Sequence, residues 1–470
     1  MTRSGIAILI FSCAYIAVGS EVGTRPNVLL IISDDLRAEL GCYAGMARTP
    51  NLDRLASAGV WFDRAYCQFP LCNPSRSSML TGKHPTTIGI LDNRTSFRQT
   101  RPGLVSMPQW FRQHGYLTFR AGKIFHGGID DPCAWTQADQ DDEDLAGPPA
   151  RGSQWPPPGD AKLTKAQRSD RYLVLEGDGE GHPENAVAER TIGYLRQYKD
   201  RPFFIGCGFS KPHSPPTAPR RFYQWYDPNK IPLPVDFAPR PTVPEGFPRA
   251  AIRPRNADLF VNRDATEQEA RQMIRAYLAS VSWMDWNTGR VIAELDRLGL
   301  RQKTIIVFWG DNGYQLGEKG KWSKAGSLFE QGARVPLIIF APGLAGNDRV
   351  CYRIVQSVDI FPTLVQLCGL PMPQGLEGRS LVPLLKDPGA AWDHPAFTVW
   401  SEDGTSLWAV AVRAGRWRYA QFQAGGAMLF DEQTDPLELK NLANDPNYAS
   451  ICEDLSGLAA EYASSLAGRQ

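Results

Sequence analysis

Four continuous apolar runs stand out from the mixed polar and apolar pattern of the chain. They cover residues 27–33, 203–209, 304–309 and 335–341. Such runs are typical of strands buried inside a parallel sheet, because a half-exposed strand would alternate apolar with polar residues. The pattern therefore predicts four central strands, and three of them end in clusters of polar residues.

Amphipathic stretches between these runs predict helices. One helix is expected over 50–58 with Thr49 as its cap, and another over 184–198. A third is expected to open at the capping box Thr266–Glu269 and to extend to about residue 298. Because strands alternate with helices, we expect an α/β fold with a large, mostly parallel sheet that is flanked by helices on both faces.

The pattern changes near residue 395, where short apolar segments separated by turns replace the long runs. These segments are 397–401, 408–413, 417–423 and 428–431. They predict a smaller C-terminal antiparallel sheet, and the stretch from about residue 448 predicts a helix that closes it. We therefore expect a main α/β domain over 21–394, which would hold the active site, and a C-terminal α+β subdomain over 395–470.

The first 20 residues have the layout of a secretory signal peptide. Arg3 gives a basic start, an apolar run follows over 6–18, and small residues precede a cleavage site after Gly19 or Ser20. The apolar run is shorter than the ~20 residues that span a bilayer. We therefore expect an exported protein, periplasmic or extracellular, without stable membrane insertion.

Charge and cysteine content exclude several classes of protein. The 51 lysines and arginines balance 50 aspartates and glutamates, so the chain has no basic field of the kind that binds nucleic acid. Hydrophobic residues make up 43% of the chain, which excludes global disorder. The nine cysteines include no CxxC pair, so the sequence does not support a zinc ribbon or a thioredoxin-like site.

Two of the polar clusters at strand ends are rich in oxygen ligands. Asp34–Asp35 closes the first apolar run, and Asp311–Asn312 closes the third. Ligand-binding residues gather at the carboxyl ends of parallel strands, and adjacent carboxylates need a cation or basic groups to stay ionised together. Carboxylate and amide oxygens suit calcium or magnesium better than a soft metal. Either pair alone could cap a turn, but the two together favour a metal site.

A second signal is the segment that begins at Cys72. Pro74 fits the first turn of a helix that runs to about Leu80, with Cys72 just ahead of that helix. The free N–H groups at a helix start and the fixed charge of Arg76 both suit an anion. The alternative is a structural cysteine buried beside a helix cap.

The same segment carries a family resemblance. Cys72-x-Pro74-Ser75-Arg76, followed by Leu80-Thr81-Gly82, resembles the signature of the type I sulfatases in the alkaline phosphatase superfamily. The resemblance covers nearly the whole mature chain, and its other segments are 34–35, 122–126, 211–213, 311–313, 322–324 and 429–442. Segments 122–126 and 211–213 are most similar to the iduronate-2-sulfatases, although the animal enzymes of that group carry histidine where this chain has Asn312.

This resemblance implies an enzyme that hydrolyses sulfate monoesters. It implies that a maturation enzyme reads the motif and oxidises Cys72 to formylglycine, whose hydrate attacks sulfur with one hydroxyl and expels sulfate through the other. It assigns a calcium ion to Asp34, Asp35, Asp311, Asn312 and the modified Cys72.

The resemblance also assigns roles to basic residues of the chain. Arg76 would hold the formylglycine hydrate, and the sulfate group would be lined by Lys123, His126, His213 and Lys324. Imidazole suits proton transfer because its pKa lies near neutrality. We therefore expect His213 to be the acid for the leaving alcohol, with Lys324 assisting, and His126 to be the base that releases sulfate.

The expected substrate is a sulfated oligosaccharide, and the segments shared with the iduronate-2-sulfatases favour a 2-O-sulfated uronate such as iduronate 2-sulfate. Two alternatives stay open. One is a phosphonate or phosphate monoester hydrolase of the same superfamily. The other is a non-catalytic binder of sulfated glycans that keeps Cys72 as a thiol, although a binder has no need of the intact maturation motif.

Overall fold

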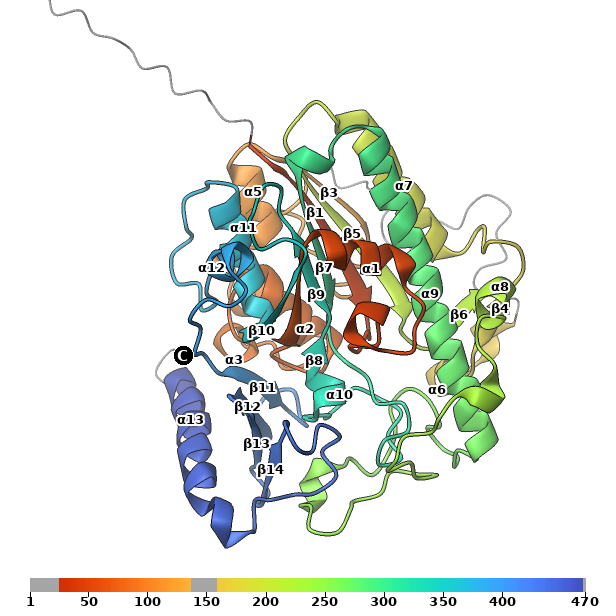
Figure 1. Ribbon diagram of the computed structural model, residues 1–470, viewed down its shortest axis with the longest axis vertical. Helices are drawn as coiled ribbons and strands as arrows, with labels where there is room; N and C mark the ends of the chain where they lie inside the picture. The colour runs from red at the N-terminus through yellow and green to blue at the C-terminus, as the bar shows by residue number, and fades with distance from the viewer. Residues whose placement is uncertain (1–24, 137–158, 468–470) are drawn as a thin grey trace, which may run out of the picture.

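One large sheet runs through the centre of the computed structural model, which describes residues 25–136 and 159–467 (Figure 1). The predicted signal peptide over 1–20 lies outside the described residues. The eight strands lie in the order β10-β2-β9-β7-β1-β5-β3, with β8 also paired to β2. Their bounds are β1 Asn27–Asp34, β2 Val60–Tyr66, β3 Leu117–Gly122, β5 Phe203–Pro212, β7 Thr304–Gly310, β8 Arg334–Val335, β9 Leu337–Phe340 and β10 Arg349–Gln356.

The sheet is mostly parallel, as predicted. Strand β1 pairs in parallel with β5 on one side and with β7 on the other, and β3 continues this order beyond β5. The apolar run over 335–341 differs from its predicted form, because Pro336 divides it into β8 and β9 and β9 pairs antiparallel with β7. Proline has no amide hydrogen to donate, so it interrupts a strand at this point.

Helices cover both faces of the sheet, which confirms the predicted layers. Alternate residues of β1 point to opposite faces, since side chains alternate along a strand. Leu29 and Ile31 pack with residues of α1, α7 and α9, whereas Leu30 and Ile32 pack with residues of α2, α5 and α11. Figure 1 shows α7 and α9 to the right of the sheet, and α5 and α11 to its left. The bounds of these helices are α1 Pro50–Ala58, α2 Cys72–Thr81, α5 Met107–Gln113, α7 Pro183–Tyr198, α9 Glu267–Arg297 and α11 Ile360–Leu367.

Several shorter helices and one separate pair of strands complete the main body of the fold. They are α3 Pro85–Ile88, α4 Phe97–Thr100, α6 Lys165–Ser169, α8 Arg220–Tyr223, α10 Glu330–Ala333, α12 Val382–Lys386 and the strand pair β4 Leu173–Leu175 with β6 Thr217–Pro219. Within residues 25–136 and 159–467, no helix has both the length and the apolar character needed to cross a membrane. None of the cysteines in these two ranges is disulfide-bonded.

Of the two predicted helix caps, the structure confirms the one at α9 but not the one at α1. At α9 the capping box is confirmed, because Thr266 Oγ1 accepts from the Glu269 amide at 3.3 Å and Glu269 Oε2 accepts from the Thr266 amide at 3.0 Å. At α1 the helix is confirmed, but Thr49 does not cap it through its side chain. The Thr49 hydroxyl instead accepts from the Gly41 amide at 2.9 Å and donates to Asp53 at 3.0 Å.

The C-terminal part forms the predicted antiparallel sheet and helix. Its strands lie in chain order and are β11 Ala396–Trp400, β12 Ala409–Ala414, β13 Trp417–Phe422 and β14 Ala427–Asp431. Helix α13, Ala449–Ala467, packs against β12 and β13 through residues such as Leu455 and Ala459 (Figure 1).

A buried charge cluster joins this small sheet to the main body. Glu330 of α10 accepts from Arg413 Nε at 3.2 Å and also pairs with Arg418. Two further carboxylates crowd the same guanidinium, with Glu438 Oε1 at 3.2 Å and Glu432 Oε1 at 3.6 Å from Arg418 Nε. Burial, together with the negative charges of Glu330 and Glu438, raises the pKa of Glu432. Three carboxylates thus share two arginines, with Arg334 and Lys319 further offsetting Glu330 and Glu438.

Replacing Glu432 with glutamine should therefore stabilise the protein at alkaline pH. A carboxyl whose folded pKa is raised contributes stability below its unfolded pKa and loses it as pH rises, so the native protein loses stability above about pH 4.5 through this group. We expect Glu432→Gln to raise Tm by about 2 °C or more at pH 8 and to change it little at pH 4. Thermal unfolding at both pH values tests this, with the exposed Glu453→Gln on α13 as the matched control. A Tm difference independent of pH would contradict the account.

Candidate active site

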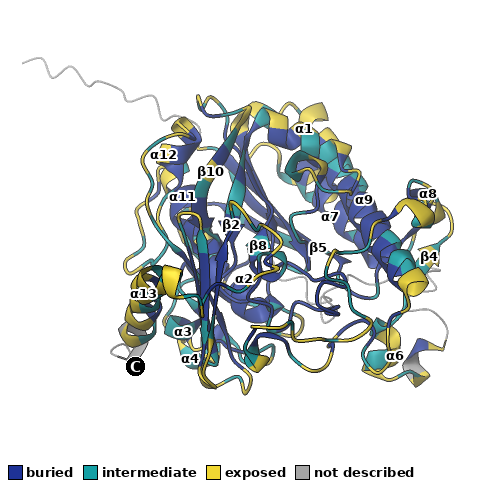
Figure 2. Ribbon diagram, turned by 60° about the horizontal axis from the view of Figure 1, so that its bottom comes forward, coloured by how far each residue is buried: buried dark blue, intermediate teal, exposed yellow. Residues whose placement is uncertain are grey.

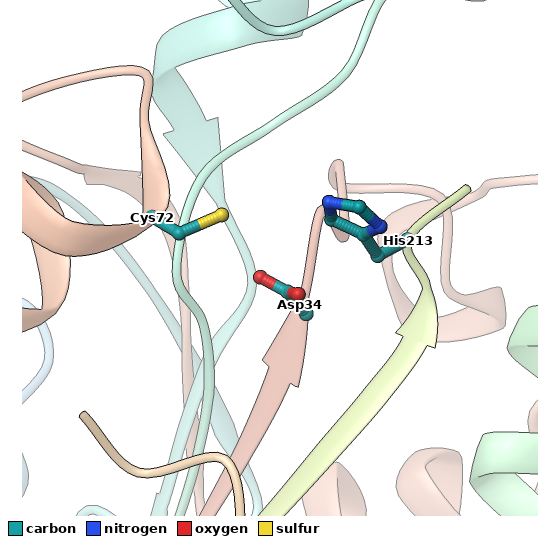
Figure 3. A group of neighbouring side chains, drawn as sticks. All are labelled: Asp34, Cys72 and His213. Carbon is teal, nitrogen blue, oxygen red and sulfur yellow. The ribbon is translucent and has the colours of Figure 1, made fainter. Parts of the chain in front are cut away.

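Cys72 lies at the start of α2, at the carboxyl edge of the central sheet. The helix begins at Cys72 itself, not just after it as predicted, and Leu71 holds the extended cap position. Figure 3 shows the Cys72 sulfur pointing toward the carboxylate of Asp34 at the end of β1, with His213 beyond it at the end of β5. Cys72 is 1% exposed, and its Sγ lies 3.9 Å from Oδ1 of Asp35. The cysteine therefore faces a buried polar site.

The two acidic pairs meet because β1 and β7 are parallel neighbours. Ser33 is in register with Gly310, so the residues that follow each strand converge, and the Asp35 amide donates to Asp311 Oδ1 at 3.0 Å. Carboxylate oxygens of Asp34, Asp35 and Asp311 all lie within 4.8 Å of one another. Asp35 has a φ of 60°, a left-handed conformation that is uncommon outside glycine and typical of functional sites.

The local chemistry of this cluster fits a hard cation. Asn312 Nδ2 donates to Asp35 Oδ1 at 2.9 Å, while the buried Asn312 Oδ1 has no hydrogen-bond partner within the described ranges. Burial and the charge of Asp34 raise the pKa of Asp311 to about 7. Burial also raises the pKa of Asp35. Crowded carboxylates beside an unpaired amide oxygen form the all-oxygen donor set that calcium takes.

Three cations flank the acidic cluster. Arg76 is fully buried, and its Nε lies 2.7 Å from Asp311 Oδ2 while its Nη2 lies 3.3 Å from Asp34 Oδ1. Lys123 Nζ lies 2.5 Å from Asp34 Oδ2. Burial alone would raise the pKa of Asp34, but Lys123 and Arg76 hold it well below its usual value.

Lys324 completes this group from the loop after β7. Its Nζ lies 2.6 Å from Asp35 Oδ2 and 3.7 Å from Asp258 Oδ2. The lysine is 4% exposed, so its charge acts in a site largely screened from water. All three predicted basic residues, together with the acidic cluster, therefore converge at one edge of the sheet.

The two predicted histidines also face this edge. His213 Nδ1 lies 2.8 Å from the carbonyl oxygen of Ser214, and its Nε2 lies 3.8 Å from Asp35 Oδ2. Because a carbonyl only accepts, Nδ1 carries the ring proton and the neutral ring presents a bare Nε2. Burial and the charge of Lys324 lower the pKa of His213 to about 3. Burial and the charge of Lys123 also lower the pKa of His126 to about 3, so both rings are neutral in the free protein.

A cavity of about 590 Å³ opens above these groups. Four of the predicted residues line it, namely Lys123, His126, His213 and Lys324. The cavity also has lining residues that sequence reasoning did not single out, which include Asn93, Arg94, Lys165, Glu184, Ser210 and Asp258. These residues belong to no shared motif, so only the folded chain brings them to the site.

The sequence matches known families over most of its length. A sequence model of the family described as "Sulfatase" matches residues 26–370. The chain belongs to the sulfatase family. A second model, described as "N-sulphoglucosamine sulphohydrolase, C-terminal", matches residues 317–463. This sulfatase is thus a sulfuric ester hydrolase, which confirms the predicted sulfatase family and enzyme class.

Individual relatives agree with this placement. The sulfatase is 34% identical to mouse iduronate 2-sulfatase over 409 residues, which cover 76% of this chain and 71% of the mouse protein. A structure described as a complex with its substrate D-glucosamine-2-N,6-O-disulfate superposes with a TM-score of 0.73 at 22% identity, over 95% of this chain and 99% of the other. The phosphonate monoester hydrolase of Agrobacterium radiobacter superposes with a TM-score of 0.75 at 22% identity, over 95% of this chain and 96% of the hydrolase chain. At such identities the two structures show a shared fold.

Proposed function

We propose that this sulfatase removes sulfate from a sulfated carbohydrate, with Cys72 converted to formylglycine and a calcium ion held at the acidic cluster. The observation that carries the proposal is the convergence of the motif cysteine, the acidic cluster and the basic side chains beneath one cavity. Residues 1–20 support export to the periplasm or the extracellular space.

The calcium ion would be held by Asp34, Asp35, Asp311, Asn312 and the modified residue 72. When bound, it supplies positive charge that neutralises the sulfate group. Arg76 and Lys123 keep Asp34 ionised for this role, since both cations lower the pKa of that carboxyl.

An unmodified thiol is poorly suited to attack sulfur at this site. Burial and the nearby charge of Asp34 raise the pKa of the Cys72 thiol well above its usual value, so it stays protonated and weakly nucleophilic. A formylglycine hydrate supplies an attacking hydroxyl and a second hydroxyl whose deprotonation expels sulfate. This contrast supports a maturation enzyme as a required partner.

The cavity side chains would bind sulfate and move protons. Lys123, His213 and Lys324 are placed to bind the anionic group, and Arg76 to hold the hydrate of residue 72. His213 would protonate the leaving alcohol with Lys324 assisting, and His126 would act as the base that releases sulfate. Since the free His213 ring is neutral, its acid role requires the bound sulfate ester to raise its pKa, which a nearby negative charge does.

The acid role predicts a dependence on the leaving group. Replacing His213 with glutamine should lower kcat on a sugar sulfate by about 100-fold, because a sugar alkoxide needs a proton to leave. On 4-nitrophenyl sulfate the loss should be several times smaller, since nitrophenolate leaves without one. Steady-state kinetics on the two esters test this, and His114→Gln, outside the cavity, is the control. Equal losses on both esters would assign the acid role elsewhere.

The similarity to mouse iduronate 2-sulfatase best supports a 2-O-sulfated uronate, such as iduronate 2-sulfate, as the substrate. The fold likeness to a phosphonate monoester hydrolase keeps that activity as the second candidate. Turnover of an iduronate-2-sulfate disaccharide, an aryl sulfate and an aryl phosphonate separates the two. Preference for the disaccharide supports the proposal, preference for the phosphonate favours the second candidate, and binding without turnover favours a glycan binder.

A further inference from the structure

We propose that the mouth of the cavity binds a second anionic group of the substrate, a carboxylate or a further sulfate, through Arg94 and Lys165. This inference rests on the proposed function and narrows its substrate to sugars that carry two negative charges.

The cations on the floor are already engaged by acidic groups. Lys123 and Lys324 each lie within 2.6 Å of a carboxylate oxygen of the acidic cluster. Arg94 and Lys165 line the same cavity but are exposed. In the part of the chain that the structure describes, neither side chain forms an ion pair, although the charge of Arg94 contributes to lowering the pKa of the nearby Asp92 carboxyl. Both cations can therefore still pair with a ligand.

The loop that presents Arg94 is anchored to the start of helix α2. Asn73, next to Cys72, donates through Nδ2 to the carbonyl oxygens of Asp92 at 2.8 Å and Thr95 at 2.9 Å. The Asn73 amide donates to Asn93 Oδ1 at 3.0 Å. Asp92 Oδ1 in turn accepts from the amides of Arg94 and Thr95 at 2.9 and 2.8 Å. The Arg94 backbone is therefore fixed relative to residue 72 before any ligand binds, which lowers the entropic cost of binding.

Lys165 approaches the cavity from a different element. It opens α6, whose capping box pairs Thr164 and Gln167 at 2.9 and 3.3 Å. Figure 2 shows α6 at the lower right and α4, which follows the Arg94 loop, at the lower left. Arg94 and Lys165 therefore line one cavity from two different elements, the loop before α4 and helix α6.

The acidic residues of the cavity do not cancel these charges. Asp258 is 9% exposed and lies 3.7 Å from Lys324, and Glu184 is 1% exposed and accepts from the Ser210 amide at 2.9 Å. Both carboxylates are buried and engaged, whereas the exposed charged residues among the described lining of the cavity, Arg94 and Lys165, are positive. An arginine fork and a lysine together suit a carboxylate or sulfate.

The test compares kcat/KM on substrates that differ in charge. The doubly charged substrates are an iduronate-2-sulfate disaccharide and a derivative in which the carboxylate is reduced to an alcohol and a second sulfate is added. The singly charged substrates are the reduced disaccharide without the second sulfate and 4-nitrophenyl sulfate. Arg94→Gln and Lys165→Gln should each lower by about tenfold the ratio of kcat/KM for the doubly charged substrates to kcat/KM for the singly charged ones. Arg94→Lys should lose less, and Lys162→Gln, a charge removed outside the cavity, should leave the ratio unchanged. Dependence on the carboxylate or on the second sulfate identifies which group binds.

Two outcomes separate this inference from the proposed function. If the native enzyme hydrolyses the sugars but the ratio is the same in Arg94→Gln and Lys165→Gln, the inference is wrong and the proposed function stands. If no ester is hydrolysed, the proposed function fails. The inference that the cavity mouth binds an anionic group can then still be tested by calorimetry, which measures how the same sugars bind to the Cys72→Ala protein. Equal affinity for the carboxylated and reduced sugars there, with or without Arg94, would overturn the inference.

Discussion

Replacing Cys72 with alanine should abolish sulfate release, with kcat lowered by about 10⁴-fold or more. The variant removes the side chain that carries the proposed nucleophile while leaving the acidic cluster and the cavity lysines in place. Among the described residues, the Cys72 thiol forms one weak hydrogen bond, to Asp35 Oδ1 at 3.9 Å, so the fold should survive its loss. Sulfate release from the preferred ester, measured on protein with a native Tm, gives the answer.

A matched control separates nucleophile loss from cysteine loss. Cys351 is also fully buried but lies in β10, at the opposite edge of the sheet from β3 and β5. Cys351→Ala should keep near-native turnover. If Cys72→Ala retained full activity, the nucleophile would have to be another group.

Removing calcium should lower both turnover and stability. Without a cation, three buried carboxylates repel one another, and Arg76, Lys123 and Lys324 offset this repulsion in part. At a calcium concentration about 1,000 times Kd the bound ion contributes about 4 kcal/mol, so a chelator should lower Tm by several degrees. Adding calcium back should restore Tm and turnover, and zinc should not, because the donors are oxygens.

Asp311→Asn should remove most of the calcium-dependent rise in Tm. Asp131→Asn is the matched control, because Asp131 is also fully buried and also pairs with an arginine, with Oδ2 2.7 Å from Arg98 Nη2. The control should be less stable than the native protein yet keep its response to calcium. A Tm and turnover unaffected by the chelator would show that the cluster works without a metal.

The fold was largely predictable because its central strands are apolar on both faces. The runs that became β1, β5 and β7 could be recognised from sequence alone, and the capping box at Thr266 marked the start of α9. The edges were harder to predict. Strands β2 and β10 mix polar and apolar residues, since each is only partly buried. The antiparallel pairing of β9 with β7 depends on the long connection between the two strands, which no local pattern encodes.

The acidic part of the site and Arg76 followed from elementary rules, whereas the two lysines did not. Asp34 and Asp311 end neighbouring parallel strands, so their meeting could be expected. Lys123 follows β3, a strand that the apolar pattern does not reveal, and Lys324 lies in an irregular loop. Their assignment came from the family resemblance alone, and the residues at the cavity mouth, such as Arg94, are reached only through the folded chain.

The mass of the peptide that contains Cys72 tests the central claim most directly. The protein should be produced in a host with an active maturation enzyme, alongside a control sulfatase known to be modified there. We predict a mass that matches the aldehyde at residue 72. An unmodified thiol, found while the control is converted, would contradict the catalytic account and favour a protein that binds sulfated glycans without cleaving them.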